Sequence, residues 1–393
     1  MINYPALLVG SEWLPNRTGG LNRYFWGLSN ALGDAGIGAI GLVTFLRPGQ
    51  SGPIPIKPFA REGAGMLERI AGARSAALAA IEDGISVANP HFALYAWPWV
   101  RHVPHNVPLV VNFQGPWADE MLAECRSVRC RFKSAAARAI ERSVYTRADR
   151  CITLSNAFRE VLAVRFGVPR SRIAVVPGGV TLEPFLAAPS QSEARLKLGW
   201  PAEAKIAFCV RRLTRRMGVD LLIQATSDLR REVPDLLVII AGTGHAEAEL
   251  KAQAASAGLE DIVRFIGFLP DKQLPIAYAA ADLTVVPSVA LEGFGLILVE
   301  SLASGTPAIA TPVGGMPEVL SGFPDLVTEA ATVEALAAKL RYALSGNVAL
   351  PSPSECRAYA ARFGWQRVLP ALLAVWRDVG AEIPFDPMSH IGP

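Results

Sequence analysis

The sequence predicts an α/β fold with two Rossmann-like domains that face each other across a central cleft. Short apolar runs alternate with segments whose apolar residues recur at helical spacing, which is typical of βαβ units with a mostly parallel sheet. The pattern starts again after the run from Val175 to Val180, where a strand is followed by turn residues. Because 393 residues leave room for two domains, we place the first at 1–178 and the second at 179–365.

Each series contains apolar runs of the length expected for buried strands. In the first series these runs lie at 6–10, 38–45, 92–96, 109–113 and 151–154. In the second they lie at 206–210, 236–241, 262–266, 283–287 and 308–310. Helical spacing is clear at 24–35 and 135–146, so we expect helices there.

The end of the chain predicts a helix that returns to the first domain. Residues 355–376, with Trp365 and Trp376, have the apolar spacing of an amphipathic helix. We therefore expect residues 366–393 to form a C-terminal helix and tail that pack on the N-terminal domain. The Pro-rich part from residue 383 is expected to be loose.

The cysteines are odd in number and have no CxxC spacing: Cys125, Cys130, Cys151, Cys209 and Cys356. This argues against a disulfide framework and a thiolate zinc site, so we expect reduced, mostly buried thiols. The first ten residues lack a basic lead and an apolar run long enough for a signal peptide. No stretch of about 18 apolar residues predicts a membrane span, and we expect a cytoplasmic protein.

The net charge of +3 conceals an asymmetry, because residues 1–178 carry +8 and the remainder −5. The densest basic stretch runs from Arg126 to Lys133 and continues with Arg138 and Arg142. It predicts either a solvated helix face or peripheral contact with an anionic membrane surface or a charged acceptor. No nucleic-acid recognition motif accompanies it, so we expect no nucleic-acid partner.

Ligands of such folds bind at the carboxyl ends of the strands, and two glycine-rich turns lie there. Gly19 and Gly20 follow the first predicted strand, where they would let the backbone approach a phosphate or would form a turn with positive φ. Gly242 and Gly244 end the strand at 236–241. Neither turn is diagnostic by itself.

A cluster of four arginines follows the strand at 206–210: Arg211, Arg212, Arg215 and Arg216. Its position at a strand end, in an acidic half of the chain, favours a ligand-binding role over a salt-bridged surface loop. Guanidinium groups match the oxygens of a diphosphate.

The most informative segment holds two glutamates, Glu292 and Glu300, with Gly293 and Gly295 between them. The glycines would free backbone N–H groups at a helix start for a phosphate or a sugar hydroxyl. Glu300 lies in an apolar run, where a carboxylate needs partners. Two carboxylates that accept hydrogen bonds from hydroxyl groups fit this arrangement better than a hydrolytic acid–base pair.

No grouping of His, Asp and Glu has metal-ligand spacing, and no DxD motif is present. We therefore expect no metal site and no metal cofactor.

These motifs resemble the family 4 retaining glycosyltransferases, which have the GT-B fold. The resemblance rests on the segment Glu292–x7–Glu300, the Gly19-Gly20 loop, the link at 175–180, the Arg-Arg-Leu cluster and the Gly242 turn. It implies a nucleotide-sugar donor as co-substrate, no cofactor, and a glycan, polysaccharide or lipid-linked acceptor. A UDP-sugar is favoured and a GDP-sugar is the alternative.

The resemblance also assigns roles to residues. Glu300 would hold the ribose, Ile266 would lie beside the base, and Arg212 would bind the diphosphate. Glu292 would meet the transferred sugar, and Glu292 and Arg212 are the expected catalytic residues. The other donor-binding residues implied are Gly19, Gly20, Arg216, Gly242, Phe294, Gly295 and Leu296.

Two departures from the family pattern lie in these motifs. The family usually has Lys before Gly218, but this chain has Met217, which cannot bind phosphate; Arg215 or Arg216 could replace the charge. The family often has His where this chain has Gln114, which cannot act as a base. The acceptor-side residues expected near it are Gln114, Trp117, Asp119 and Glu120, with a structural role as the alternative for the two acids.

The function predicted is a retaining, metal-independent hexosyl transfer from a nucleotide-sugar. A catalytically weak or inactive donor-binding homologue is the main alternative, because of Met217 and Gln114. A nicotinamide-dependent dehydrogenase is disfavoured, since no GxGxxG opens the first strand–helix unit.

Overall fold

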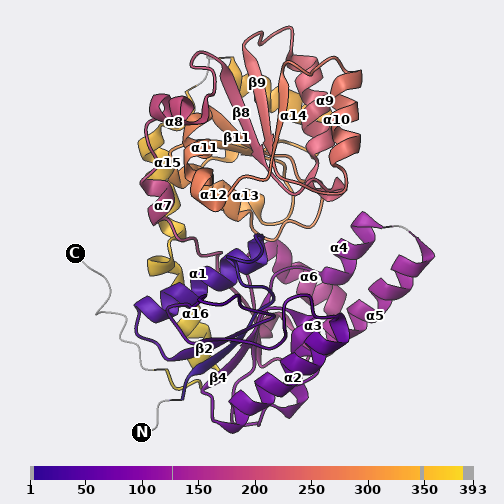
Figure 1. Cartoon of the computed structure of the whole chain (residues 1–393), viewed down its shortest axis with the longest axis vertical. Coiled ribbons are helices and arrows are strands. Elements are labelled where there is room, and N and C mark those ends of the chain that lie inside the picture. The colour runs from indigo at the N-terminus through magenta and orange to yellow at the C-terminus, as the bar shows by residue number, and fades with distance from the viewer. Residues whose placement is uncertain (1–3, 126, 346–348, 384–393) are drawn as a thin grey trace. The chain divides into compact units, whose positions relative to one another are not determined.

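The computed structural model describes residues 4–125, 127–345 and 349–383. Its contacts divide the chain into two compact units, Met1–Val180 with Phe363–Pro393, and Thr181–Arg362. Both units are α/β with parallel sheets (Figure 1), which confirms the predicted pair of Rossmann-like domains. Arg126 of the basic stretch and the Pro-rich end from residue 384 lie outside the described residues.

The first unit contains parallel strands in the order β3-β2-β1-β4 and β5-β6-β7, joined by a bridge between Ala88 and Leu109. These strands are β1 (Ala6–Val9), β2 (Ala39–Val43), β3 (Ile56–Pro58), β4 (Val87–Pro90), β5 (Val110–Phe113), β6 (Arg150–Thr153) and β7 (Ile173–Val175). Four of the five strands predicted in this half are confirmed. The direction of the strand order reverses between β1 and β4, so the loops that follow these two strands flank the ligand crevice of a Rossmann fold.

The predicted strand at 92–96 is wrong, because Ala93–Ala96 forms helix α3. The strand of this region is β4, whose four residues are all buried although two of them are Asn89 and Pro90. A short apolar run does not by itself distinguish a buried strand from a buried helix. Because β4 contains the polar Asn89, its sequence does not read as an apolar strand. The apolar run that follows β4 forms helix α3.

The helices of the first unit are α1 (Gly20–Asp34), α2 (Met66–Glu82), α3, α4 (Trp117–Glu124), α5 (Val128–Tyr145), α6 (Asn156–Phe166) and α16 (Trp365–Asp378). Local sequence sets their ends. The Ser155 hydroxyl accepts a hydrogen bond from the Phe158 amide at the start of α6, and Gly167 ends that helix in the left-handed conformation.

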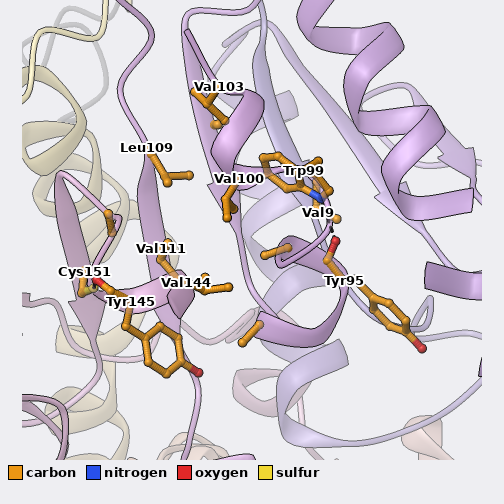
Figure 2. Close-up of a cluster of buried hydrophobic side chains, with 14 of the residues drawn as sticks. Val9, Tyr95, Trp99, Val100, Val103, Leu109, Val111, Val144, Tyr145 and Cys151 are labelled. Carbon is orange, nitrogen blue, oxygen red and sulfur yellow. Dashed lines mark hydrogen bonds between the residues drawn. The ribbon is translucent and has the colours of Figure 1, made fainter. Parts of the chain in front are cut away.

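Apolar side chains from strands and helices form the core of this unit, and Figure 2 shows part of it. Val9, Val111 and Cys151 come from strands, and Tyr95 and Tyr145 come from helices. Burial raises the pKa of the Cys151 thiol to about 12, so this cysteine behaves as an apolar core residue.

The C-terminal helix α16 belongs to the first unit and packs on α1 and β6. Two glycines make room for the ring of Trp365: a Cβ atom at Gly27 or Gly179 would come within 2.5 Å of it. The predicted single helix from 355 is two helices. α15 (Pro353–Ala360) packs on α12 within the second unit, and Gly364 separates it from α16.

The second unit has one parallel sheet in the order β10-β9-β8-β11-β12. Its strands are β8 (Lys205–Val210), β9 (Leu236–Ala241), β10 (Val263–Gly267), β11 (Leu283–Val286) and β12 (Ala308–Ala310), which confirms all five predicted strands. The helices around it are α7 (Glu183–Leu186), α8 (Gln191–Leu198), α9 (Val219–Leu229), α10 (Glu247–Ser256), α11 (Leu274–Ala280), α12 (Leu296–Ala303), α13 (Met316–Val319), α14 (Val333–Leu344) and α15. The order reverses between β8 and β11, which places a ligand crevice at the ends of these two strands.

Two of the five cysteines do not fit the prediction of reduced thiols. Cys125 and Cys130 form a disulfide that links the end of α4 to the first turn of α5. The absence of CxxC spacing did not exclude this pair, because the start of α5 brings their Cα atoms to 6.0 Å. Cys151, Cys209 and Cys356 are buried free thiols, as predicted. Among the described residues, no helix has both the length and the apolar character needed to cross a membrane.

Candidate functional site

The loops after β8 and β11 bring an arginine and a glutamate together at the crevice of the second unit. Nη2 of Arg211 lies 2.5 Å from Oε2 of Glu292. The same nitrogen donates to the hydroxyl of Ser288 and lies 2.8 Å from the sulfur of Met217. Arg211 is buried, whereas its neighbour Arg212 is exposed. The predicted carboxylate Glu292 is therefore in the site, but the arginine in contact with it is Arg211.

The loop that carries Arg211 packs closely on the end of β9. The amide of Arg211 donates to the carbonyl of Ala241 at 2.9 Å, so the loop after β8 docks on the end of β9. Gly242 has a φ of 128°, and a Cβ atom there would lie 1.8 Å from the carbonyl oxygen of Arg211. The predicted donor-binding glycine thus allows the close approach of the backbone that carries Arg211.

The backbone around Glu292 is strained and tightly held. Leu291, with a φ of 56°, is the one non-glycine residue of the described chain with positive φ. Its carbonyl accepts a hydrogen bond of 3.2 Å from the buried Arg216. Gly314 passes so close that a Cβ atom there would meet the Glu292 carbonyl at 1.7 Å. These contacts fix the direction in which the Glu292 side chain leaves the loop.

Glu292 is held in its ionised form. Burial alone would raise the pKa of this carboxyl, but the positive charge and hydrogen bond of Arg211 outweigh it, with help from Arg216 and Ser288. The net result is a pKa below the usual value. An ionised carboxylate accepts hydrogen bonds from hydroxyl groups and does not act as a general acid.

Helix α12 begins at this crevice. Gly295 caps it with a φ of 90°, which a residue with a side chain adopts only at a cost. Phe294 before it is buried, and Leu296 is its first residue. Four residues on, Glu300 is 1% exposed and its Oε2 accepts a hydrogen bond of 3.1 Å from the hydroxyl of Tyr278. Tyr278 is thus one hydrogen-bond partner of the buried Glu300 carboxylate, which the sequence predicted to need partners.

The other donor-side residues lie on neighbouring loops and strands of this unit. Ile266 is 38% exposed on β10, whose end meets the Gly242 turn. Arg215 is exposed, and its guanidinium lies 3.7 Å from the carboxylate of Glu249.

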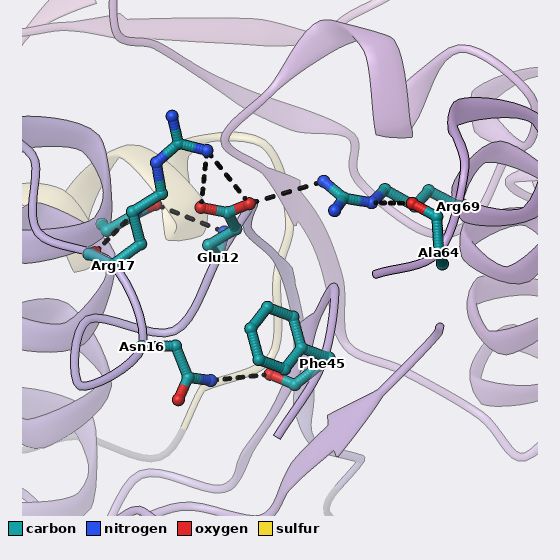
Figure 3. A network of polar contacts seen from close by, with 7 residues as sticks. Glu12, Asn16, Arg17, Phe45, Ala64 and Arg69 are labelled. Carbon is teal, nitrogen blue, oxygen red and sulfur yellow. Dashed lines mark hydrogen bonds and ion pairs between the residues drawn. The ribbon is translucent and has the colours of Figure 1, made fainter. Parts of the chain in front are cut away.

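In the first unit, a polar network fixes the loop that leads to Gly19 and Gly20 (Figure 3). The Glu12 carboxylate lies between Arg17, at 3.1 Å, and Arg69, at 3.4 Å. Gly19 then adopts a φ of 152° ahead of α1, and Cβ atoms built at Gly19 or Gly20 would meet nothing within 4 Å. The backbone at this turn is therefore open to a ligand.

The ends of β4 and β5 hold a buried polar cluster that the sequence analysis missed. The Asn112 amide donates to Asn89 Oδ1 at 2.9 Å, and the same oxygen lies 3.0 Å from Nε2 of His91. Burial lowers the pKa of His91 to about 3, so the ring is neutral. No described residue bonds Nδ1 of His91 or Nε2 of Gln114. The sequence signal that could have revealed this cluster is the presence of polar residues directly next to predicted strands.

Helix α4 carries the remaining acceptor-side candidates. The amides of Trp117 and Ala118 donate to the buried Glu141 carboxylate, at 2.8 and 3.1 Å. Burial raises the pKa of Glu141 to about 7, against the opposing effect of these bonds. The two oxygens of Asp119 accept hydrogen bonds from Arg138 and Arg165. Glu120 lies one residue further along the helix.

The helices α4, α5 and α6 also line a basic groove of about 720 Å³. Its arginines are Arg131, Arg138, Arg142 and Arg165, and apolar atoms of Leu122, Ala135 and Ala139 complete it. The predicted basic stretch therefore forms part of a concave surface. Among the described residues, no group of three or more His, Cys, Asp or Glu side chains could hold a metal ion.

Two protein-family models match consecutive parts of the chain. The model described as Glycosyltransferase Family 4 matches residues 18–184, and the model described as Glycosyl transferases group 1 matches residues 190–363. The chain belongs to glycosyltransferase family 4. This confirms the resemblance that the motifs indicated.

Several curated relatives are named D-inositol 3-phosphate glycosyltransferase. The protein of Kineococcus radiotolerans is 33% identical over 277 residues, which cover 63% of this chain and 62% of the relative. The protein of Mycolicibacterium smegmatis is 34% identical over 240 residues, covering 60% of this chain and 54% of the relative. The match thus spans less than two thirds of the length of these relatives.

Solved structures confirm the GT-B fold of this family 4 member. HepE from Anabaena, in complex with UDP, has a TM-score of 0.74 at 19% identity, covering 95% of this chain and 100% of that one. Sucrose-phosphate synthase from Thermosynechococcus elongatus has a TM-score of 0.71 at 23% identity, covering 96% and 97%.

Proposed function

We propose that this family 4 glycosyltransferase is a retaining, metal-independent enzyme that moves a hexosyl unit from a nucleotide-diphosphate sugar to a glycan, polysaccharide or lipid-linked acceptor. A UDP-sugar is the favoured donor and a GDP-sugar the alternative. The observation that carries the proposal is the convergence of Arg211, Glu292 and the start of α12 at the crevice between β8 and β11. Solved structures of HepE in complex with UDP and with UDP-glucose support the choice of base.

The chemistry follows from the charges in this crevice. A departing nucleoside diphosphate gains negative charge, which guanidinium groups and the amides of a helix start stabilise. Glu292, kept ionised by Arg211, would accept hydrogen bonds from hydroxyl groups of the transferred sugar. Glu300 would accept those of the ribose, and exposed Ile266 would lie beside the base.

We propose a retaining reaction because the candidate residues of the first unit provide no general base. His91 is neutral and buried, and Gln114 cannot take a proton near neutral pH. With neither side chain serving as a base, the departing phosphate would take the proton of the acceptor hydroxyl on the face from which it leaves.

The relatives' name supports a second candidate acceptor, a small phosphorylated polyol. The basic groove with Arg131, Arg138, Arg142 and Arg165 is the observation in this chain that favours an anionic acceptor. Exposed Val128 and Phe132 lie on the same helix as Arg131. They would equally suit peripheral contact with an anionic membrane surface that presents a lipid-linked acceptor.

The donor is tested by thermal shift with UDP, GDP and ADP, because a ligand that binds the folded state raises the melting temperature. Slow hydrolysis of the matching nucleotide-sugar then tests catalysis, and the anomeric configuration of a transfer product tests retention. Binding without hydrolysis or transfer would favour the inactive homologue. Failure to bind any nucleoside diphosphate would contradict the proposal.

A further inference from the structure

The side chain at position 217 lies where a diphosphate-binding lysine is expected, and Met217 carries no charge there. In the structure the sulfur of Met217 lies 2.8 Å from Nη2 of Arg211. We infer that Arg211 supplies the positive charge for the donor's diphosphate in place of a lysine at 217, and that it does so in partnership with Glu292. This rests on the proposed function, since it names a residue of the same donor site.

Arg211 is built into the crevice and is not a surface arginine. Its side chain is 7% exposed, and Nη2 is bonded to Glu292 and Ser288. Nε of Arg211 is buried and has no hydrogen-bond partner among the described residues. A buried donor left without a partner is costly, and an anion in the crevice would satisfy it.

Arg215 and Arg216, the two arginines next to Met217, have other contacts. Arg216 donates to the carbonyl of Leu291 and holds the loop backbone. Arg215 is 66% exposed and faces Glu249. The structure therefore favours Arg211 over Arg215 and Arg216, the replacements expected from the sequence alone.

Glu292 has a different role before and after the donor binds. Without donor, its carboxylate neutralises Arg211 and holds the guanidinium in the crevice, at the 217 side chain. When the diphosphate binds, the guanidinium has an anion of higher charge within reach, and Glu292 can turn its free oxygen to a sugar hydroxyl. A guanidinium stays protonated, so Arg211 acts by charge and loses no proton.

The test is to move the charge from 211 to 217. Titration calorimetry would measure the affinities of UDP and of uridine for the wild type, Arg211→Met, and Arg211→Met/Met217→Lys. We expect Arg211→Met to lower UDP affinity by about 10- to 100-fold and to leave uridine affinity unchanged. We expect the double variant, which places a lysine at 217, to recover most of the UDP affinity. Arg341→Met, which removes an exposed arginine paired with Glu232 in the same unit, is the matched control.

Each other outcome is decisive. If Arg211→Met binds UDP like the wild type, the inference is wrong and the proposed function stands. An equal loss for UDP and uridine, or a double variant as weak as the single one, would show that Arg211 only supports the fold. If Arg211→Met does not fold, the double variant, which keeps a cation beside Glu292, still carries the comparison. A wild type that binds neither UDP nor GDP nor ADP overturns the proposed function together with the inference.

Discussion

Two glutamates eight positions apart, Glu292 and Glu300, have different surroundings and so different capacities. Glu292 is paired with Arg211, which keeps its pKa below the usual value. Glu300 is almost fully buried and accepts a hydrogen bond from Tyr278. The first carboxylate has a charged partner, so a bound phosphate that attracts the Arg211 guanidinium would also affect Glu292. The second is fixed by an aromatic side chain, which suits recognition of an invariant part of the donor such as the ribose.

Glu300→Ala is expected to weaken binding of UDP even without a sugar attached. Loss of charge-assisted hydrogen bonds to the ribose should cost about 1.5–3 kcal/mol of binding free energy. Calorimetry with UDP, GDP and ADP measures this, with Glu232→Ala as the control because Glu232 is exposed and paired with Arg341. Unchanged affinities for all three nucleotides would remove Glu300 from the ribose site.

Glu141 predicts a pH dependence of stability. Its pKa is raised to about 7 by burial, whereas an unfolded glutamate has a pKa near 4.5. Between these values the folded state binds more protons, so the free energy of unfolding falls as the pH rises. The contribution of Glu141 is fully present below about pH 4.5 and is lost above about pH 7, by up to about 3 kcal/mol.

The measurement is the difference in unfolding free energy between the wild type and Glu141→Gln from pH 4.5 to 7. Subtraction removes the opposite effect of His91, whose lowered pKa adds stability as the pH rises. The same subtraction for Glu160→Gln should show no fall, because Glu160 is exposed and Arg170 lowers its pKa. A flat difference for Glu141→Gln would mean that its bonds to α4 offset burial completely.

At the scale of elements, glycines without a side chain allow the backbones of the site loops to pack against each other. The loops after β8 and β9 touch backbone to backbone at Arg211 and Gly242, and the loop after β12 meets that of β11 at Gly314 and Glu292. These glycines could be recognised from the sequence as strand-end turns. That they face the backbone of a site residue, and not a ligand, depends on the pairing of strands and is not visible in the sequence.

Gly242→Ala is therefore expected to disturb Arg211. Its Cβ atom would lie 1.8 Å from the Arg211 carbonyl oxygen at a φ of 128°, so the loop must move. Strain and overpacking together should cost about 2–4 kcal/mol of stability, and UDP affinity should fall with it. Thermal unfolding and UDP titration measure the two effects. Gly38→Ala is the control, since a Cβ atom there meets its nearest neighbour at 3.8 Å; equal melting temperatures for both variants would contradict the expected clash.

At the scale of the whole molecule, the two βαβ series and nine of the ten predicted strands could be predicted from apolar runs. The tenth could not, because β4 contains Asn89 and Pro90 while the apolar run after it is helical. The site predicted from Glu292, Glu300 and a cluster of arginines stays a prediction, and the structure adds the contact between Glu292 and Arg211. That Arg211 is the arginine in contact with Glu292 could not be predicted, because Arg211 and Arg212 are adjacent in the sequence and only the folded chain shows that Arg211 is buried and Arg212 exposed.

The last prediction is that the enzyme neutralises the diphosphate of the leaving group with its own residues and needs no metal ion. In the crevice of the second unit the diphosphate would meet the guanidinium of Arg211 and the start of α12, with Arg212 on the same loop. These groups are preorganised, so they stabilise the leaving group without a divalent ion. Hydrolysis of UDP-glucose, followed by release of UDP, should therefore proceed at the same rate in excess EDTA. A parallel reaction with EDTA saturated by Mg²⁺ shows whether the chelator itself inhibits. If the rate vanished in EDTA and returned with Mg²⁺ or Mn²⁺, a metal ion would be neutralising the diphosphate and the role given to Arg211 would have to be shared with it.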